Sequence, residues 1–269
     1  MDQIQGKVVV ITGGSDGIGK ALVELYLNKG AKVATCARNY QKLYQLQSAH
    51  TGKPLFIHAT DVSKETDCRG FIDAVIKEFG TIDILINNAG VSMRALVQDV
   101  DLDTIRRVMD INFWGTVYCT KFALDHIIKN KGTIVGVSSI AGYRGLPGRS
   151  GYSASKYAVN GWVEALRTEL LESGANIMWV CPGFTSSNIR NAALNQEGKS
   201  QSESPFDESK LMPAEVVAKE IFKAINKQKS YLYLSFQGKA TLFLSKFFPR
   251  LLDKLVYNTV AKEKDSPFK

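Results

Sequence analysis

Short hydrophobic runs alternate along the chain with longer stretches of helical pattern. The first run, at 8–12 (VVVIT), is continuously apolar and rich in β-branched residues, which is typical of a strand buried on both faces of a sheet. Comparable runs follow at 32–37, 54–59, 82–87, 132–137, 175–181 and 231–234. The pattern therefore predicts seven strands.

Helical patterns fill most of the intervals between these strands. The first ends near Lys29, with Gly30 after its last residue, and the second runs from a Ser63 cap to Glu78 and ends at Gly80. Further helices are predicted at 101–129, 150–172 and 213–227, the last with Pro213 as its first residue. No linker or repeat divides 1–269, so we expect one doubly wound α/β domain, a parallel seven-stranded sheet with helices on both faces.

A glycine-rich turn, Thr-Gly-Gly-Ser-Asp-Gly-Ile-Gly at 12–19, joins the first strand to the first helix. Glycines let a backbone approach a pyrophosphate closely, and a helix N-terminus offers free N–H groups and partial positive charge. The alternative is a turn that is merely tight, but the strand–turn–helix context favours a nucleotide. The residues expected along the phosphates are Gly13, Ser15, Asp16, Gly17, Ile18 and Gly19.

The end of the second strand indicates which dinucleotide is bound. In this fold an acid at that place binds the ribose 2′-OH of NAD, whereas an arginine accommodates the 2′-phosphate of NADP. Here Arg38 and Asn39 follow the strand and no acid is present, which predicts NADP(H). The alternative is that Arg38 is an ordinary surface arginine with no part in cofactor binding. Asp16 conflicts with the NADP(H) prediction, because it adds negative charge near the phosphates.

Four positions suggest carbonyl chemistry. Tyr152 and Lys156 lie at i and i+4, on one face of a predicted helix, where a cation would lower the pKa of the phenol and make it a proton donor or acceptor. The alternative for this pair is a core tyrosine beside a surface lysine. Ser139 follows the fifth strand, at the edge where open α/β sheets bind ligands, and Asn112 lies inside a helix that an asparagine disfavours.

Together these residues resemble the classical short-chain dehydrogenase/reductase family, whose fold is of the Rossmann type. The matching motifs, in the family's order and spacing, are 12–19, 61–62, 87–90, Asn112, Ser139, Tyr152, Lys156 and 182–183. The resemblance implies that Tyr152 is the general acid/base, that Lys156 binds the nicotinamide ribose and lowers the tyrosine pKa, that Ser139 polarises the substrate carbonyl, and that Asn112 holds a relay water.

The same resemblance assigns further residues to the cofactor. Asp61 and Val62 are expected beside the adenine, and Asn88, Ala89 and Gly90 along the dinucleotide. Pro182 and Gly183 precede a hydroxyl that contacts the nicotinamide carboxamide, either Ser187 or Thr185. Because all four catalytic positions are filled, the resemblance favours an active enzyme.

Two segments extend this pattern. The polar stretch 188–211 is long for a connection and is predicted to be a substrate lid. The stretch 239–262 is an amphipathic, basic extension that Pro249 is expected to divide into two helices. Its hydrophobic and basic positions suit an anionic membrane surface, or packing on the domain or on a second subunit. It resembles the tail of the membrane-associated branch typified by 11β-hydroxysteroid dehydrogenase type 1.

The amino-acid composition limits the classes of protein to which this chain can belong. Hydrophobic residues make up 45% and charged residues 22%, ordinary globular values. Of the net charge of +8, nearly all falls after position 218, where eleven Lys and Arg face four Asp and Glu, so binding of nucleic acid by the whole domain is disfavoured. The four cysteines are widely spaced and the three histidines form no ligand motif, so buried thiols and no metal site are expected. No signal peptide or membrane span is predicted.

We therefore predict an NADP(H)-dependent oxidoreductase that interconverts a carbonyl and a secondary alcohol on a lipophilic substrate, such as a steroid, a keto-lipid like 3-ketodihydrosphingosine, or a xenobiotic carbonyl. The alternatives are a 3-ketoacyl thioester reductase and a non-catalytic cofactor-sensing protein. A cytoplasmic location, with peripheral contact at the inner membrane surface through the extension, is expected. A homodimer or homotetramer is expected from the resemblance, and the stripe Trp114, Tyr118 and Phe122 fits such an interface or packing on the sheet equally well.

Overall fold

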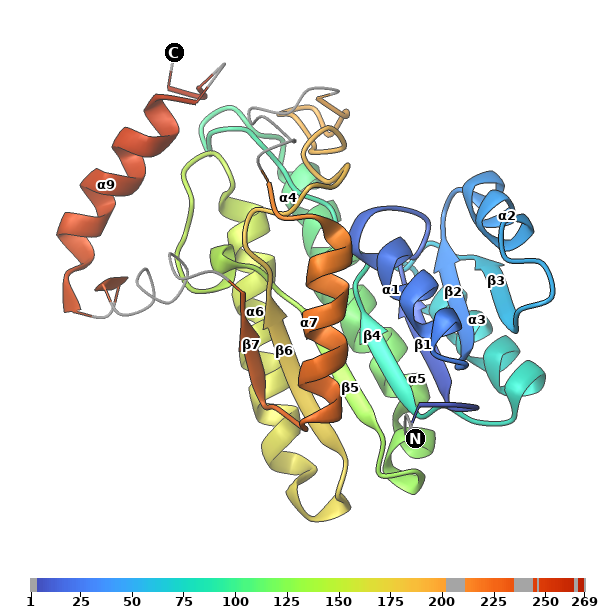
Figure 1. The fold of residues 1–269 in the computed structure, drawn as a ribbon. Coiled ribbons are helices and arrows are strands. Elements are labelled where there is room, and N and C mark those ends of the chain that lie inside the picture. Colours follow the sequence, from blue (N-terminus) through green and yellow to red (C-terminus); the bar gives the residue numbers. More distant parts are fainter. Residues whose placement is uncertain (1–3, 202–210, 235–243, 246, 264–265, 269) are drawn as a thin grey trace.

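The computed structural model describes residues 4–201, 211–234, 244–245, 247–263 and 266–268. Within them the strands form one parallel sheet with the order β3-β2-β1-β4-β5-β6-β7 (Figure 1). The bounds are β1 Val8–Thr12, β2 Lys32–Ala37, β3 Leu55–Ala59, β4 Ile84–Asn87, β5 Thr133–Val137, β6 Asn176–Cys181 and β7 Tyr231–Tyr233. The predicted seven-stranded doubly wound sheet is confirmed. Its order reverses between β1 and β4, where such sheets bind ligands.

Helices cover both faces of the sheet because successive strand residues point to opposite sides. Val9 and Ile11 of β1 share one core with α1 (Gly17–Asn28), α2 (Tyr40–Ser48) and α7 (Ala214–Asn226). Val8 and Val10 pack on the other side against α3 (Glu65–Phe79) and α5 (Gly115–Lys129), and the same core extends to α6 (Ser150–Glu169). Both faces of β1 are fully buried, which explains its continuous apolar sequence.

The predicted helix at 101–129 is not continuous. It consists of α4 (Leu102–Met109), a π-helical turn at Asp110–Trp114, and α5. Single π-helical turns inside α-helices often mark functional positions, and this one contains Asn112. The helix α2 was not predicted at all, since its two buried residues, Leu43 and Leu46, give too weak a pattern.

Helix ends were predicted with mixed success. Gly30 and Gly80 follow α1 and α3 with positive φ angles of 81° and 80°, as glycines after helices do. Ser63 is not the cap of α3, which begins at Glu65 after Lys64, because its hydroxyl donates to Asp61 Oδ1 at 2.7 Å instead. Pro213 lies just before α7 rather than in it, and α6 ends three residues early, followed by a 3-10 turn at Leu171–Ser173.

The C-terminal helix α9 (Pro249–Ala261) lies beside the loop that precedes α6 and covers neither face of the sheet (Figure 1). Residues 244, 245 and 247 are helical and Pro249 is the first residue of α9, so the predicted division at Pro249 is confirmed. Residues 202–210 of the predicted lid, and 239–243 and 246 of the predicted extension, lie outside the described residues. Among the helices of the described part, none is long and apolar enough to cross a bilayer.

Candidate active site

The carboxyl ends of β1, β4, β5 and β6 bring distant segments to one edge of the sheet (Figure 1). The glycine-rich turn follows β1, residues 88–90 follow β4, Ser139 follows β5, and residues 182–187 follow β6. Because parallel strands in register end at the same edge, the separate sequence motifs become neighbours.

The glycine-rich turn is braced against the segment after β4. Thr12 Oγ1 accepts hydrogen bonds from the backbone N–H groups of Asn88 and Ala89, both at 3.0 Å, and Asn88 Nδ2 donates to Thr12 O at 2.9 Å. Gly13 has a φ of 72°, and a Cβ there would lie 2.8 Å from the Cα of Ala89. A Cβ at Gly19 would lie 2.2 Å from Gly13 O. The turn therefore needs glycine at these positions, and its close fit at the N-terminus of α1 suits a dinucleotide pyrophosphate.

Asp16 has a structural task in this turn. It caps α1, with Oδ1 accepting from the N–H of Gly17 at 2.8 Å, and its other oxygen pairs with Lys42 of α2 at 3.2 Å. The Lys42 ammonium offsets the negative charge of Asp16, which would otherwise disfavour a phosphate at this turn. Lys42 had not been singled out from the sequence, because the helix that carries it was not predicted.

Arg38 and Asn39 lie where the sequence placed them, at the exposed end of β2. Asn39 caps α2, and its Oδ1 accepts from the N–H of Lys42 at 3.0 Å. Among the residues that the structure describes, no ion pair involves the Arg38 guanidinium. Lys42 lies four positions after Arg38, in the helix α2 that follows β2. The two side chains come from segments that border the glycine-rich turn, which is an arrangement that can bind a phosphate.

Asp61 and Val62 follow β3 on the same edge. The Asp61 carboxylate accepts from the N–H and the hydroxyl of Ser63, at 3.1 and 2.7 Å. Val62 is buried, and a Cβ at Gly115 would lie within 3.0 Å of it. The π-helical turn before Gly115 therefore packs closely on this predicted adenine-binding segment.

Tyr152 and Lys156 share a face of α6, as predicted. Lys156 Nζ lies 5.8 Å from the centre of the Tyr152 ring and donates to Val137 O at 2.8 Å. The Ser139 side chain lies close enough to the Tyr152 hydroxyl to favour its ionised form. A Cβ at Gly90 would lie 3.5 Å from Lys156 Nζ and 3.1 Å from Asn112 Oδ1. The structure thus brings together Ser139, Tyr152, Lys156, Gly90 and Asn112, which come from the β4–β5 and β5–β6 connections.

Burial dominates the acid–base properties of the pair. Burial raises the pKa of Tyr152 above its usual value, while the hydrogen bond from Ser139 and the positive charges of Arg149 and Arg190 act in the opposite direction. Burial lowers the pKa of Lys156 to about 8. The net direction for Tyr152 is the reverse of the one expected from a neighbouring lysine, because desolvation of a phenolate is the larger effect here.

Asn112 is 1% exposed, and its side chain holds the loop after β4 to α6. Its Oδ1 accepts from Val91 N at 2.8 Å, and its Nδ2 donates to Val91 O and to Ser155 Oγ, both at 2.9 Å. Both amide hydrogens are therefore engaged. This bracing was not apparent from the sequence, since Val91 and Ser155 belong to other segments. The relay-water role implied for Asn112 stays a prediction.

The segment after β6 reaches over the glycine-rich turn. A Cβ at Gly17 would lie 2.9 Å from the Cβ of Ser187, so Ser187 lies directly against the turn. Thr185 is buried and donates its hydroxyl to Gly183 O at 3.0 Å, while its own carbonyl accepts from Arg190 at 2.6 Å. Pro182 and Gly183 connect β6 to these residues. Of the two alternatives, Ser187 has the position next to the predicted cofactor path.

The described part of the predicted lid packs on the loop after β4. Leu194 is 5% exposed and lies in a small core with Met93, on which Tyr152 also packs. Backbone hydrogen bonds join Leu194 N to Ser92 O and Arg94 N to Leu194 O, at 2.9 and 2.8 Å. The segment thus forms one wall near Tyr152. That it acts as a lid stays a prediction.

All four cysteines are buried and unpaired, as predicted. Among the described residues, no group of three or more His, Cys, Asp or Glu side chains is placed to hold a metal ion.

Comparisons with known proteins identify a family that this chain resembles. The family model of the short chain dehydrogenases matches residues 7–198. The chain is 33% identical over 262 residues to an uncharacterized oxidoreductase of Bacillus subtilis, covering 95% of this chain and 73% of that protein. It is 36% identical over 261 residues to 11-beta-hydroxysteroid dehydrogenase-like 2 of Arabidopsis thaliana, covering 95% of this chain and 82% of that one.

A solved structure gives the same result for the fold. The short chain dehydrogenase/reductase of Burkholderia phymatum, in complex with NAD, superposes with a TM-score of 0.81 at 25% identity. The match covers 94% of this chain and 97% of that chain. The similarity therefore spans the sheet, the covering helices and the carboxyl edge described above.

Proposed function

Because the chain belongs to the short-chain dehydrogenase family of oxidoreductases, we propose that it interconverts a carbonyl and a secondary alcohol, with NADP(H) as the hydride carrier. The observation that carries the proposal is the meeting of Tyr152, Ser139 and Lys156 beside Gly90, at the edge that the glycine-rich turn borders. A phenol, a hydroxyl and an ammonium are the groups that such a reaction needs for handling a proton.

A bound nicotinamide supplies the hydride for reduction of a carbonyl carbon and accepts it in the reverse direction. In this proposal, Gly13, Gly17 and Gly19 line the phosphates of the dinucleotide cofactor, and Lys156 lies near its nicotinamide ribose. Tyr152 gives its proton to the carbonyl oxygen during reduction and takes it back during oxidation. Ser139 donates a hydrogen bond to the same oxygen, which stabilises the negative charge developing there.

The test compares Tyr152→Phe with Tyr157→Phe, a matched control at a residue that lies five positions later on α6 and is 47% exposed. Tyr152→Phe is expected to lower turnover of ketones and secondary alcohols at least about 100-fold, the usual size of an acid–base contribution, with cofactor binding preserved. Tyr157→Phe should retain turnover. A Tyr152→Phe variant as fast as the wild type would refute the mechanism.

The same assay separates the alternatives. Turnover of 3-ketoacyl thioesters faster than of steroid, keto-lipid and xenobiotic ketones would favour the thioester reductase. Cofactor binding without turnover of any substrate in the panel would favour the cofactor-sensing protein. We expect the lipophilic ketones to be reduced fastest, because hydrophobic side chains border Tyr152 through Met93 and Leu194.

The preference for NADP(H) rests on Arg38, with Lys42 nearby. Arg38→Asp should weaken NADPH binding at least about tenfold and leave NADH binding nearly unchanged, since only the 2′-phosphate is bound by the guanidinium. Titration of the fluorescence of Trp114, Trp162 and Trp179 measures both affinities. Equal weakening of the two cofactors, or tighter binding of NADH by the wild type, would refute this part of the proposal.

The outward side of α9 supports the proposed peripheral contact with a membrane. Leu252 and Val260 are buried toward the protein, whereas Leu251 and Leu255 are 54% and 48% exposed on the opposite side. Arg250 and Lys254 are exposed along one flank. An exposed hydrophobic stripe with a cationic flank suits the interface of an anionic bilayer.

Sedimentation with phosphatidylserine-containing vesicles tests this contact. Leu251→Glu/Leu255→Glu is expected to abolish binding, whereas Leu171→Glu, at a leucine that is 73% exposed outside α9, should preserve it. Added salt should weaken the wild-type binding. If the wild-type protein does not sediment with the vesicles, and the double variant has a lower mass in solution than the wild type, then Leu251 and Leu255 contact a second copy of the chain.

Homo-oligomer formation is proposed through α5 and the turn before it. Trp114 is 43% exposed, and its ring stacks on Tyr118 with 5.6 Å between the centres. Cys119, Ala123 and Ile127 are the buried α5 residues of the sheet core, and Tyr118 and Phe122 pack partly buried against the same core. Trp114 is the residue of the stripe that lies outside this packing, so it is the one that favours an interface. Trp114→Glu is expected to lower the mass measured by analytical ultracentrifugation, and an unchanged oligomer would exclude this interface.

A further inference from the structure

A buried cluster of three charges joins the C-terminal segment to the region around Tyr152. The Glu263 carboxylate accepts from Arg94 at 3.1 Å and from Arg149 at 3.1 and 3.3 Å. The side chains of Arg94, Arg149 and Glu263 are only 10%, 12% and 7% exposed. Surface ion pairs contribute little to stability, but a carboxylate buried between two guanidiniums is held firmly, because removing it leaves two like charges together in a poorly hydrated place.

The cluster lies next to the segments that carry the proposed reaction. Arg149 immediately precedes α6, and its carbonyl accepts from the N–H of Ser153, beside Tyr152. Arg94 follows Met93, which packs in the small core that Tyr152 adjoins. The N–H of Ala95 donates to Gly148 O at 2.9 Å, which ties the two arginine-bearing loops together. Glu263 thus joins the two loops that carry Arg94 and Arg149, next to the first turn of α6.

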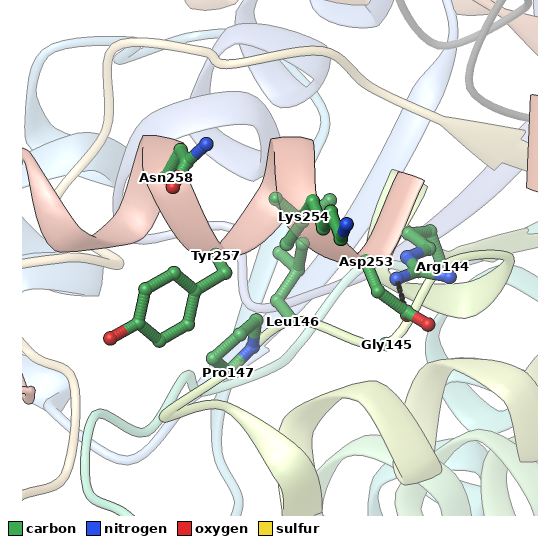
Figure 2. A pocket seen from close by; sticks show the side chains of 9 residues that line it. Arg144, Gly145, Leu146, Pro147, Asp253, Lys254, Tyr257 and Asn258 are labelled. Carbon is green, nitrogen blue, oxygen red and sulfur yellow. Dashed lines mark hydrogen bonds and ion pairs between the residues drawn. The ribbon is translucent and has the colours of Figure 1, made fainter. Parts of the chain in front are cut away.

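The rest of the C-terminal segment packs on the same loop. Figure 2 shows α9 facing Leu146 and Pro147, with Asp253 paired to Arg144. The cavity that these residues line has a volume of about 650 Å³. A Cβ at Gly148 would lie 3.0 Å from Pro267. Asp253 is 64% exposed, so its pair with Arg144 is the surface counterpart of the buried Glu263 cluster on the same segment.

We propose that Glu263 is a positioning residue for the reaction at Tyr152: its carboxylate fixes Arg149 at the start of α6 and offsets the positive charge that Arg149 places near the phenol. The inference rests on the proposed function of Tyr152. It gives the C-terminal segment a part in the chemistry, although Glu263 is more than one hundred residues from Tyr152 along the chain.

Several groups face Tyr152. The Ser139 side chain lies near its hydroxyl, and Lys156 Nζ lies over its ring. Arg149 and Arg190 act on it through their charges, and the Cys181 thiol lies at the end of β6. Burial raises the pKa of the Cys181 thiol to about 12, so that it is uncharged at neutral pH. Arg149 is the group among these that Glu263 contacts. Loss of the Glu263 charge therefore strengthens the positive field of Arg149 at the phenol.

The experiment compares Glu263→Gln, Arg149→Gln and the control Asp253→Asn. The readout is the alkaline titration of the Tyr152 phenolate, taken as the absorbance difference between each protein and the same protein carrying Tyr152→Phe. A unit charge about 10 Å away shifts a pKa by about 0.3 to 1 unit at an effective dielectric constant of 20–80. We expect a shift of that size to lower pH for Glu263→Gln, a shift to higher pH for Arg149→Gln, and none for Asp253→Asn.

Opposite signs are the decisive result. If the cluster only tethered the C-terminal segment, both Glu263→Gln and Arg149→Gln would let water reach Tyr152, and both would shift the titration to lower pH. Shifts in the same direction, or no shift in Glu263→Gln, would overturn the proposal. If Glu263→Gln does not fold, Glu263→Gln/Arg94→Gln removes the like-charge pair, leaves Arg149 without its carboxylate, and must give the same shift to lower pH.

Activity measurements complete the test and separate the two claims. In the direction of alcohol oxidation with NADP⁺, the acidic limb of kcat/KM should move to lower pH in Glu263→Gln and return to its wild-type position in Glu263→Asp. If Tyr152→Phe retains full activity, the proposed function fails, whatever the titration shows. If Tyr152→Phe is inactive and the Glu263→Gln titration is unshifted, the proposed function stands and the role of Glu263 fails.

Discussion

Replacing Lys156 with methionine removes an ammonium that is buried in the structure. The side chain is 4% exposed, and Nζ has a hydrogen bond to Val137 O at 2.8 Å. Burial lowers the pKa of this lysine from the usual 10.5 to about 8. Methionine has a similar length and no charge, so the variant keeps most of the packing while removing the titrating group.

The size of the effect follows from the two pKa values. Because the folded-state pKa lies below the unfolded-state pKa, the unfolded chain binds more protons between about pH 8 and 10.5, and the free energy of unfolding rises with pH in that window. A difference of about 2.5 units corresponds to about 3 kcal/mol in total, and the part gained between pH 7 and 9.5 is about 2 kcal/mol. In the Lys156→Met variant this increase in the free energy of unfolding with pH is absent.

Urea unfolding at several pH values between 7 and 9.5 measures the difference. The stability of the wild type relative to Lys156→Met is expected to increase by about 2 kcal/mol across this range. Lys77→Met, at an exposed lysine of α3, is the matched control and should stay parallel to the wild type. If the wild-type and Lys156→Met curves are also parallel, within about 0.5 kcal/mol, then Lys156 is not held in a desolvated site and the reasoning is wrong.

Four further substitutions test other parts of the structure. Gly13→Ala places a Cβ 2.8 Å from Ala89 at a φ of 72°, so fluorescence titration should show at least about tenfold weaker NADPH binding. Asn112→Ala leaves the backbone groups of Val91 without partners, and chemical unfolding should show a loss of about 2–4 kcal/mol. Gly80→Ala, at a φ of 80° with no atom near the new Cβ, should destabilise α3 by about 1 kcal/mol, whereas Gly70→Ala inside the same helix should stabilise it by a similar amount.

Much of the fold could be predicted from the sequence because its signals are local. A strand buried on both faces requires a continuous apolar run, as in β1. A helix that ends in a left-handed residue favours glycine, as after α3. The glycine-rich turn, and the spacing of Tyr152 and Lys156, are also local. Each of these features depends on residues a few positions apart.

The predictions that failed did so for different physical reasons. Ser63 has the composition of a helix cap, but the Asp61 carboxylate takes its hydroxyl. The helix at 101–129 looks continuous by periodicity, yet it contains the π-helical turn around Asn112. Helix α2 has little hydrophobic pattern and is fixed by its capping residue Asn39 and its contact with β3.

The alternation of strands and helices, the glycine-rich turn and the residue types of the candidate site can all be predicted from the sequence alone. Each of them depends on short-range periodicity and on the chemistry of neighbouring residues. The tertiary structure alone decided how the site is held. It placed Ser187 on the glycine-rich turn, Lys42 on Asp16, and Glu263 between two arginines beside α6. These contacts join residues that lie 26 to 170 positions apart, and only the packing of the whole sheet and its helices brings such residues within a few ångströms.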